Sequence, residues 1–139
     1  MRHRKQTAKL GRTSSHREAL LSALVNALIE QSRIQTTLAK AKAAGRYAEK
    51  MVTLGKKSTV EGRRRALAFL GRKRTVSKLF DVVAPCFSGR EGGYTQVIKL
   101  GSRSSDGSEM AILKWVENIP SSSEKGVEEK NKEVEPVAD

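Results

Sequence analysis

Apolar residues recur at helical spacing in the first third of the chain. Ser15 and Glu18 stand three residues apart in SSHREALL, a capping-box pattern that is typical of a helix N-terminus. The stretch that follows predicts an amphipathic helix of about four turns. Its inner face is predicted to hold Leu20, Leu24, Ala27 and Leu28, with Ser22, Asn26 and Glu30 on the far side.

The second helical pattern, LAKAKAAGRYAEKMVTLG, has small residues on its inner side. Thr37 is placed to cap it. The inner face is predicted to be Leu38, Ala41, Gly45, Ala48, Val52 and Gly55, and the outer face Lys42, Arg46, Glu49, Lys50 and Thr53. Small inner residues permit close packing against a neighbour, at some cost in helix propensity for Gly45.

Two shorter helices are predicted next. Ser58 and Glu61 form a second capping box before VEGRRRALAFL. Thr75 is the expected cap of VSKLFDVVA, and Pro85 is expected to end that helix because proline has no backbone N–H to donate. The inner face of this fourth helix is predicted to hold Val76, Leu79, Phe80 and Val83.

Three stretches lack helical spacing and are predicted to be strands. RIQTT, residues 33–37, is rich in β-branched residues and is expected to form a short edge strand. YTQVIKL and MAILKWV alternate between apolar and polar residues and are expected to pair, joined by the flexible loop GSRSSDGSE. The predicted order is therefore helix, strand, three helices and two strands.

Charge indicates what kind of partner this protein has. The chain holds 27 Lys and Arg against 15 Asp and Glu, a net charge of +12. Residues 1–116 carry +16, whereas residues 117–139 carry −4. Unpaired like charge works against compact folding, so the excess points to a polyanionic partner. No apolar run approaches the roughly 18 residues that span a membrane.

The two ends of the chain differ from the middle. The first seventeen residues hold six Lys or Arg and no acid, and the isolated apolar residues there do not form a signal peptide. We interpret residues 1–14 as an extended basic arm, with an organelle presequence as the weaker alternative. Residues 117–139 are acidic and poor in apolar residues, and are predicted to be disordered. A solvated extension is the favoured role for this tail, and shielding of the basic surface is the alternative.

Catalytic chemistry is not expected. His3 and His16 both lie in or next to the basic arm, and the single cysteine, Cys86, lies between a proline and a phenylalanine. That apolar setting predicts a buried or half-buried structural thiol. The phosphate-binding patterns GxGxxG and GxxxxGK[ST] are absent. We therefore expect no enzyme activity, no metal site and no cofactor.

Three basic clusters are the candidate binding residues, because each cation can neutralise a phosphate and release condensed counterions. They are Arg2, Arg4, Lys5, Lys9, Arg12 and Arg17 in and beside the arm, Lys56, Lys57, Arg63, Arg64 and Arg65 around the third helix, and Arg72, Lys73 and Arg74 after it. The alternative for Arg63–Arg65 is a solvated helix face, with the stem of Arg63 covering the core. Tyr94 and Trp115 are expected in the core rather than as stacking platforms. A disordered arm fits the crevices of a folded RNA better than duplex DNA.

These segments together resemble a known family. MRHRK, LGRTSSHREALLSAL, RIQTTLAKAK, RRRALAFL, KLF and GGYTQVIKLG are similar, in order from Met1 to about Val116, to the bacterial large-subunit ribosomal protein L17 family. The resemblance implies an α/β (α+β) two-layer domain over residues 15–116, with helices packed on a small sheet. It also implies RNA contacts at Arg2, His3, Arg4, Lys5, Leu10, Gly11, Arg12, Thr13, Ser14, Ser15, His16 and Arg17. The chain departs from the family pattern at Gln96, where Arg is common, and at SSDGSEMA before the last strand.

The sequence thus predicts a structural, non-enzymatic protein that binds and organises large-subunit ribosomal RNA. Lys99 and Arg103 in the hairpin complete the candidate set. Neighbouring large-subunit ribosomal proteins are the other expected partners, in the cytoplasmic ribosome. No membrane, small-molecule substrate or independent homo-oligomer is expected. The alternatives are a DNA-binding protein whose third and fourth helices imitate a helix-turn-helix, and an RNA-modifying enzyme.

Overall fold

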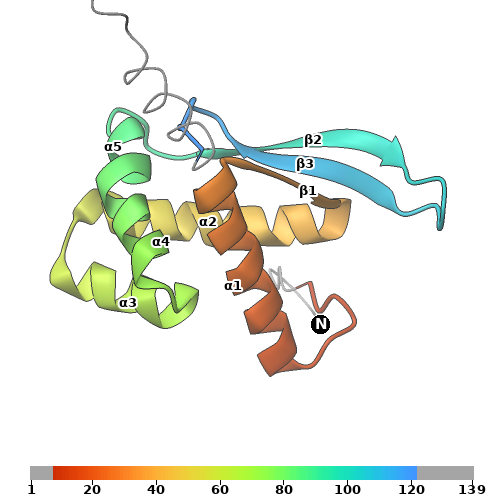
Figure 1. The fold of residues 1–139 in the computed structure, drawn as a ribbon, viewed down its shortest axis with the longest axis horizontal. Helices are drawn as coiled ribbons and strands as arrows, with labels where there is room; N and C mark the ends of the chain where they lie inside the picture. The colour runs from red at the N-terminus through yellow and green to blue at the C-terminus, as the bar shows by residue number, and fades with distance from the viewer. Residues whose placement is uncertain (1–7, 122–139) are drawn as a thin grey trace, which may run out of the picture.

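Helices cover one face of a small antiparallel sheet (Figure 1). The computed structural model describes residues 8–121. In chain order the elements are α1 (Ser14–Gln31), β1 (Arg33–Thr37), α2 (Leu38–Lys57), α3 (Val60–Leu70), α4 (Lys73–Lys78), the π-helical turn η1 (Leu79–Val83), α5 (Ala84–Cys86), β2 (Thr95–Ser102) and β3 (Glu109–Trp115). The predicted order and the α+β class are confirmed, with α4, η1 and α5 together forming the expected fourth helix.

The last strand of the chain is the central strand of the sheet. β3 pairs antiparallel with β1 on one side and with β2 on the other, so β1 is the edge strand that was predicted. Leu113 of β3 lies between Ile34 and Val97, and this row packs into the core beneath the helices. The β2–β3 hairpin extends past the helices at its far end (Figure 1).

Helix α2 approaches its neighbours closely because its inner residues are small. Its buried residues are Ala41, Ala43, Ala44, Gly45, Ala48, Met51, Val52 and Gly55. A β-carbon added at Gly45 would lie 3.3 Å from the Thr95 hydroxyl oxygen, and one at Gly55 would lie 2.8 Å from the β-carbon of Ala84. The predicted inner face is therefore confirmed, except that Leu38 is only half-buried. Both glycines are required by the short distance to the sheet and to α5.

Three aromatic rings fill the end of the core where helices and strands meet. The Phe87 ring is fully buried, with its centroid 5.1 Å from that of Tyr94 and 5.8 Å from that of Trp115. Tilted pairs of this kind contribute about 0.5–1.5 kcal/mol each beyond their buried area. The Trp115 indole N–H donates to the Leu28 carbonyl at 3.2 Å, which satisfies its one polar atom. Tyr94 and Trp115 are core residues, as predicted.

The helix starts differ from the predicted capping boxes. The N-cap residue of α1 is Thr13, so Ser15 lies inside the helix. The N-cap of α3 is Thr59, whose hydroxyl accepts a hydrogen bond from the Gly62 N–H at 3.0 Å. Ser58 instead ends α2 in the left-handed conformation, with φ 53°. Ser and Thr residues close together offer several caps at each boundary, and the chain uses one that lies two residues before Ser15 and one residue after Ser58.

The fourth helix also begins and ends elsewhere than predicted. Thr75 is buried inside α4, which starts at Lys73, so it is not a cap. Pro85 does not end the helical segment, which continues for one more residue to Cys86. The π-helical turn η1 lies directly before this last piece. The wider π turn reduces the clash that a proline ring makes with the preceding turn of a regular α-helix. Thr37 does stand at the N-cap of α2, although its side chain makes no capping hydrogen bond.

The buried face of α1 is rotated from the predicted one. Its buried residues are Leu21, Val25, Asn26, Leu28 and Ile29. The prediction was wrong for Asn26, because α3 and α4 pack on the side of α1 that was expected to face solvent. The Asn26 amide nitrogen donates to the Leu70 carbonyl at 2.9 Å, which offsets part of the cost of burying it.

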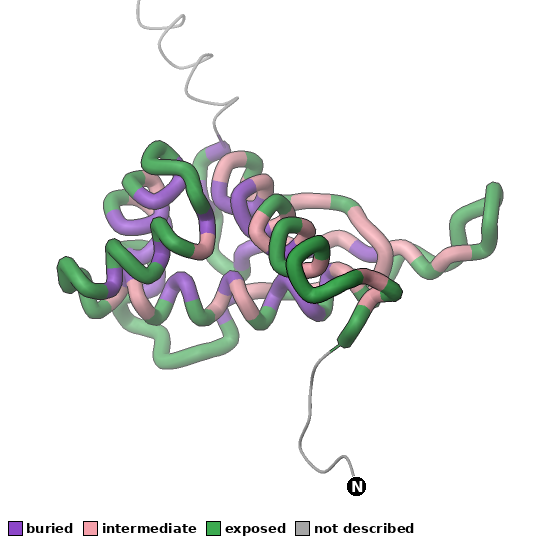
Figure 2. The backbone as a smooth tube through the Cα atoms, turned by 90° about the horizontal axis from the view of Figure 1, so that it is seen from below, coloured by how far each residue is buried: buried purple, intermediate pink, exposed green. Residues whose placement is uncertain are grey.

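Packing continues past Val116. The side chain of Ile119 is 2% exposed, and the Ser32 hydroxyl donates to the Ile119 carbonyl at 2.6 Å. Figure 2 shows buried residues on the inner sides of the helices and exposed residues at the tip of the hairpin. The predicted arm residues 1–7 and the predicted tail residues 122–139 lie outside the described residues.

Substitution Gly55→Ala tests the close approach of α2 to α5. The added methyl group overlaps the β-carbon of Ala84, so we expect the free energy of unfolding to fall by about 1–2 kcal/mol, the overpacking cost less the gain in helix propensity. Urea unfolding measures this difference. Gly89→Ala is the matched control, because a β-carbon there meets nothing within 4 Å. Equal stability of the two variants would contradict the packing argument.

Candidate nucleic-acid interface

The described end of the arm is fixed to the domain by a tight turn. Leu10 and Gly11 both have positive φ, at 55° and 65°, and the Leu10 side chain packs against the core. The Arg12 guanidinium donates to the Leu10 carbonyl at 2.9 Å, which holds the turn. Lys9 remains exposed beside it. Residues that the resemblance assigned to RNA contact thus have a local structural role here as well.

The described part of the arm starts beside a groove on α2. Ala8, the first described residue, lines a groove with Thr37, Lys42 and Arg46, and Glu109 lines it from the hairpin. Lys42, Arg46 and Lys50 are spaced by four residues and are exposed along one face of α2. Our candidate set missed this row, although its i, i+4 spacing is visible in the sequence.

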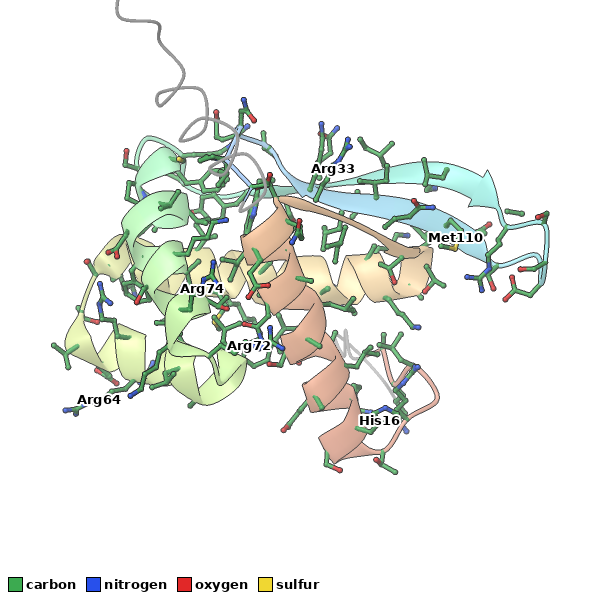
Figure 3. The ribbon with its side chains drawn as sticks, viewed as in Figure 1. His16, Arg33, Arg64, Arg72, Arg74 and Met110 are labelled. Carbon is green, nitrogen blue, oxygen red and sulfur yellow. The ribbon has the colours of Figure 1, made fainter. Side chains whose placement is uncertain are left out.

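Four exposed cations extend over three packed helices, and we call them the helical basic surface. They are Lys57 at the end of α2, Arg64 in α3, and Lys73 and Arg74 in α4. Within residues 8–121, none of the four has an acidic partner. Figure 3 shows Arg64 and Arg74 on the α3–α4 side of the molecule. All four were candidate residues, and the fold brings them from separate segments onto adjoining elements.

Other candidate cations in this region are engaged by the protein itself. The Arg63 guanidinium lies 4.6 Å from the centroid of the Phe80 ring and 3.5 Å from the Asp81 carboxylate. Arg65 pairs with Glu61 one turn away on the same helix. These ion pairs reduce the positive charge available to a partner. The stem of Arg63 was predicted to cover the core, and the structure places its guanidinium over the ring of Phe80, a buried core residue.

Lys56 also makes intramolecular contacts. Its ammonium group donates to the Arg90 carbonyl and to the Tyr94 hydroxyl, and it lies 5.3 Å from the centroid of the Tyr94 ring. These contacts join the end of α2 to the segment before β2. Among the predicted binding residues, Lys56 is therefore placed mainly to hold the fold.

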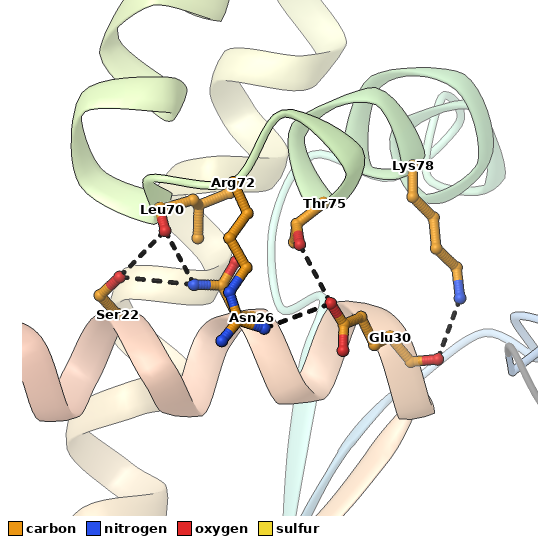
Figure 4. A network of polar contacts seen from close by, with 7 residues as sticks. All are labelled: Ser22, Asn26, Glu30, Leu70, Arg72, Thr75 and Lys78. Carbon is orange, nitrogen blue, oxygen red and sulfur yellow. Dashed lines mark hydrogen bonds and ion pairs between the residues drawn. The ribbon is translucent and has the colours of Figure 1, made fainter.

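A polar network between α1 and α4 engages Arg72 and Lys78, which stand in the sequence on either side of Lys73 and Arg74 (Figure 4). The Glu30 carboxylate lies 3.5 Å from the Arg72 guanidinium and accepts a hydrogen bond from the Thr75 hydroxyl at 3.3 Å. The Lys78 ammonium donates to the Glu30 carbonyl at 3.0 Å, at the end of α1. Arg72 is thereby engaged, while the next two residues, Lys73 and Arg74, remain exposed.

The hairpin tip is closed by an ion pair. The Arg103 guanidinium donates to both carboxylate oxygens of Asp106, at 2.9 and 2.5 Å, and the Ser108 N–H donates to the same carboxylate at 3.1 Å. These hydrogen bonds hold the pKa of Asp106 well below its ordinary value, with Arg103 as the main cause. Arg103 is therefore engaged by Asp106 within the loop GSRSSDGSE, whereas Lys99 is exposed on β2.

The sheet face that points away from the helices carries two cations that the candidate set omitted. The register aligns Arg33, Lys114 and Gln96 in one row across the three strands, and Gln35, Ile112 and Ile98 in the next. We call these six residues the outer sheet face. Arg33 points away from the helical layer (Figure 3). Nothing in the sequence aligns Arg33 with Lys114, because their pairing depends on β3 lying beside β1.

The structure bears on the predictions about metal binding and about Cys86. No group of three or more His, Cys, Asp or Glu is placed in the described part of the chain to hold a metal ion. The prediction for Cys86 was wrong: its thiol is exposed, and it donates to the Val82 carbonyl at 3.1 Å. The fourth helix turns this residue outward because α5 buries Ala84 instead. No described helix has the length and hydropathy to cross a membrane.

The fold and these surfaces define a class: a small basic α+β protein with several separate groups of exposed cations. Comparison with known proteins narrows the class. A family model described as ribosomal protein L17 matches residues 20–116. Large ribosomal subunit protein bL17 of Methylacidiphilum infernorum is 48% identical over 117 residues, which are 84% of this chain and 89% of that protein. The chain therefore belongs to the ribosomal protein L17 family, a family of structural rather than enzymatic proteins.

Two further relatives agree with this assignment. Protein bL17 of Finegoldia magna is 50% identical over 109 residues, which are 78% of this chain and 83% of that protein. Protein bL17 of Fusobacterium nucleatum is 45% identical over 116 residues, which are 84% of this chain and 100% of that protein. The rest of this chain thus has no counterpart in the Fusobacterium protein.

The ion pair at the hairpin tip is expected to survive acidification. The pKa of Asp106 is lower in the folded hairpin than in the unfolded chain. Its stabilising contribution is therefore complete above the ordinary carboxyl pKa of about 4 and is lost as pH falls towards the lowered value. An NMR titration of the Asp106 carboxyl carbon should give a higher midpoint in the variant Arg103→Gln. An unchanged midpoint would show that Arg103 does not set this pKa.

Proposed function

We propose that the protein is a structural constituent of the large ribosomal subunit and binds ribosomal RNA through the arm and the helical basic surface. The observation that carries the proposal is that some of the basic side chains pair with acids of the domain while others do not. Acids of the domain pair with Arg63, Arg65, Arg72 and Arg103, while Lys57, Arg64, Lys73 and Arg74 have no acidic partner within residues 8–121. Membership of the ribosomal protein L17 family supports RNA as the polyanion.

Phosphate neutralisation is the main source of affinity in this proposal. Each exposed cation that meets a phosphate releases condensed counterions, so affinity falls steeply as salt rises. The arm contributes cations with no acid among them, and Lys42 and Arg46 line the groove at Ala8, where the described part of the arm starts. The helical basic surface contributes a second group of cations, on α2, α3 and α4. RNA segments bound to the two groups are fixed relative to each other because one rigid domain joins them.

The arrangement favours folded RNA over duplex DNA. A helix-turn-helix protein needs an exposed reader helix with varied polar side chains. In α3, three residues are buried and Arg65 is paired with Glu61, and α4 has only six residues. Cations spread over an arm and three helices fit the irregular surface of an RNA fold instead. In a competition assay at equal salt, folded large-subunit RNA should displace the protein from duplex DNA.

The proposed function also implies protein partners in the large subunit. Neighbouring large-subunit proteins are proposed to contact the parts of the surface that carry little positive charge, and the ribosome places the protein in the cytoplasm. The site residues proposed from sequence remain Arg2, His3, Arg4, Lys5, Lys9, Leu10, Gly11, Arg12, Thr13, Ser14, Ser15, His16 and Arg17, with Lys57, Arg64, Lys73, Arg74 and Lys99. Lys42 and Arg46 are added from the groove on α2.

Neutralising the arm tests the first contact surface. In the variant Arg2→Gln, Arg4→Gln, Lys5→Gln, three phosphate contacts are removed while the length of the arm is kept. We expect the slope of log K against log salt to become shallower by about 2–3, measured by filter binding to large-subunit RNA. An unchanged slope would show that the arm does not meet phosphate.

Two adjacent arginines test the helical basic surface. Arg64 has no acidic partner among the described residues, whereas Arg65 pairs with Glu61. Arg64→Ala is expected to lower the same salt slope by about 1, and Arg65→Ala, the matched control on the same helix, by less. An equal decrease of the salt slope in both variants would mean that pairing with Glu61 does not keep Arg65 from binding phosphate. Circular dichroism checks that both variants keep their helices.

A further inference from the structure

The outer sheet face is chemically different from the RNA-binding surfaces. It holds Arg33 and Lys114 at one end and Ile98 and Ile112 beside them, with Gln35 and Gln96 completing the two rows. Ile98 is 37% exposed, which is high for a large apolar residue. These six residues include no acid and no aromatic ring. The face therefore lacks both the density of cations and the stacking groups that single-stranded RNA requires.

A groove joins this face to the end of the domain. Arg33 and Lys114 line it together with Ile119 and Ser121, the last described residue. Ile119 is anchored there by burial and by the hydrogen bond from Ser32. Glu117 also lines the groove, but its carboxylate lies 3.4 Å from the Arg90 guanidinium. The last described residue, Ser121, thus lies in the same groove as Arg33 and Lys114. Neither of these two cations pairs with an acid among the described residues.

The segment that follows has a composition complementary to the face. Residues 122–139 hold six acids, three lysines and three valines, and no aromatic residue. Eighteen residues span up to roughly 60 Å when extended. Three paired strands are only about 10 Å across, and a strand of eight residues is about 26 Å long. The segment therefore has the reach to cross the whole face from its start at Ser121.

We propose that residues 122–139 dock on the outer sheet face, with their acids near Arg33 and Lys114 and their valines against Ile98 and Ile112. The tail then covers the side of the domain opposite to the helical layer and leaves the proposed RNA-binding surfaces open. This arrangement differs from shielding of the helical basic surface, because the anchor at Ile119 starts the tail on the sheet. It also goes beyond the proposed function, which requires only the arm and the helices.

A spin label on the tail tests the docking in the full chain. The label is attached at Val134→Cys in the background Cys86→Ser, which removes the exposed thiol and keeps a side-chain donor. Amide signals of Gln35, Ile98 and Ile112 are expected to lose about half or more of their intensity if most molecules are docked, while α3 signals are retained. The loss should decrease at about 0.5 M salt, where the Debye length is only about 4 Å.

Charge reversal provides the matched control. In Arg33→Glu, Lys114→Glu with the same label, the signals of Gln35 and Ile112 should recover. If that variant does not fold, Arg33→Gln, Lys114→Gln removes the same attraction with a milder change. Broadening centred on α3 and α4, or no local broadening at all, would overturn the proposal. A loss of RNA affinity in the charge variants without any tail contact would instead assign the outer sheet face to RNA.

Discussion

The short distance between α2 and its neighbours is the constraint on which the structure depends. The chain has only six aromatic residues, so its core cannot be filled by large rings throughout. Alanines and glycines on α2 instead bring the helix within contact of the sheet at Thr95 and of α5 at Ala84. Close packing recovers dispersion energy that a looser core of small residues would lose. The result is a thin, rigid domain whose long charged side chains remain at its surface.

Ion pairs determine which of the many cations face a partner. In the described domain, acids on α1, α3, η1 and the hairpin engage Arg72, Arg65, Arg63 and Arg103. Exposed pairs of this kind stabilise the fold by only about 0–1 kcal/mol each. Their larger effect is on the electrostatic potential, which is less positive at the paired arginines than at the cations without an acidic partner. The positions of the acids are therefore as informative about the binding surface as the positions of the cations.

The order of the elements was predictable, because helical and alternating periodicities are local properties of the sequence. The caps were not, since Ser58 and Thr59 are equally suitable residues and only the path of the chain selects one. Asn26 was misplaced because the packing of α3 and α4 on α1 is a tertiary contact. The basic clusters were visible in the sequence, but the contacts of Lys56 and the pairing of Arg63 with Asp81 were not. Arg33 and Lys114 became neighbours only through the strand order.

The central position of β3 has a consequence for how the domain folds. Ile34 of β1 and Leu113 of β3 are separated by most of the domain in sequence, yet they are directly paired. The sheet therefore cannot form until the last strand has been synthesised, because β1 and β2 both pair with β3 and not with each other. Non-local pairing of this kind slows folding. During synthesis the helices therefore emerge before any strand of the sheet can pair.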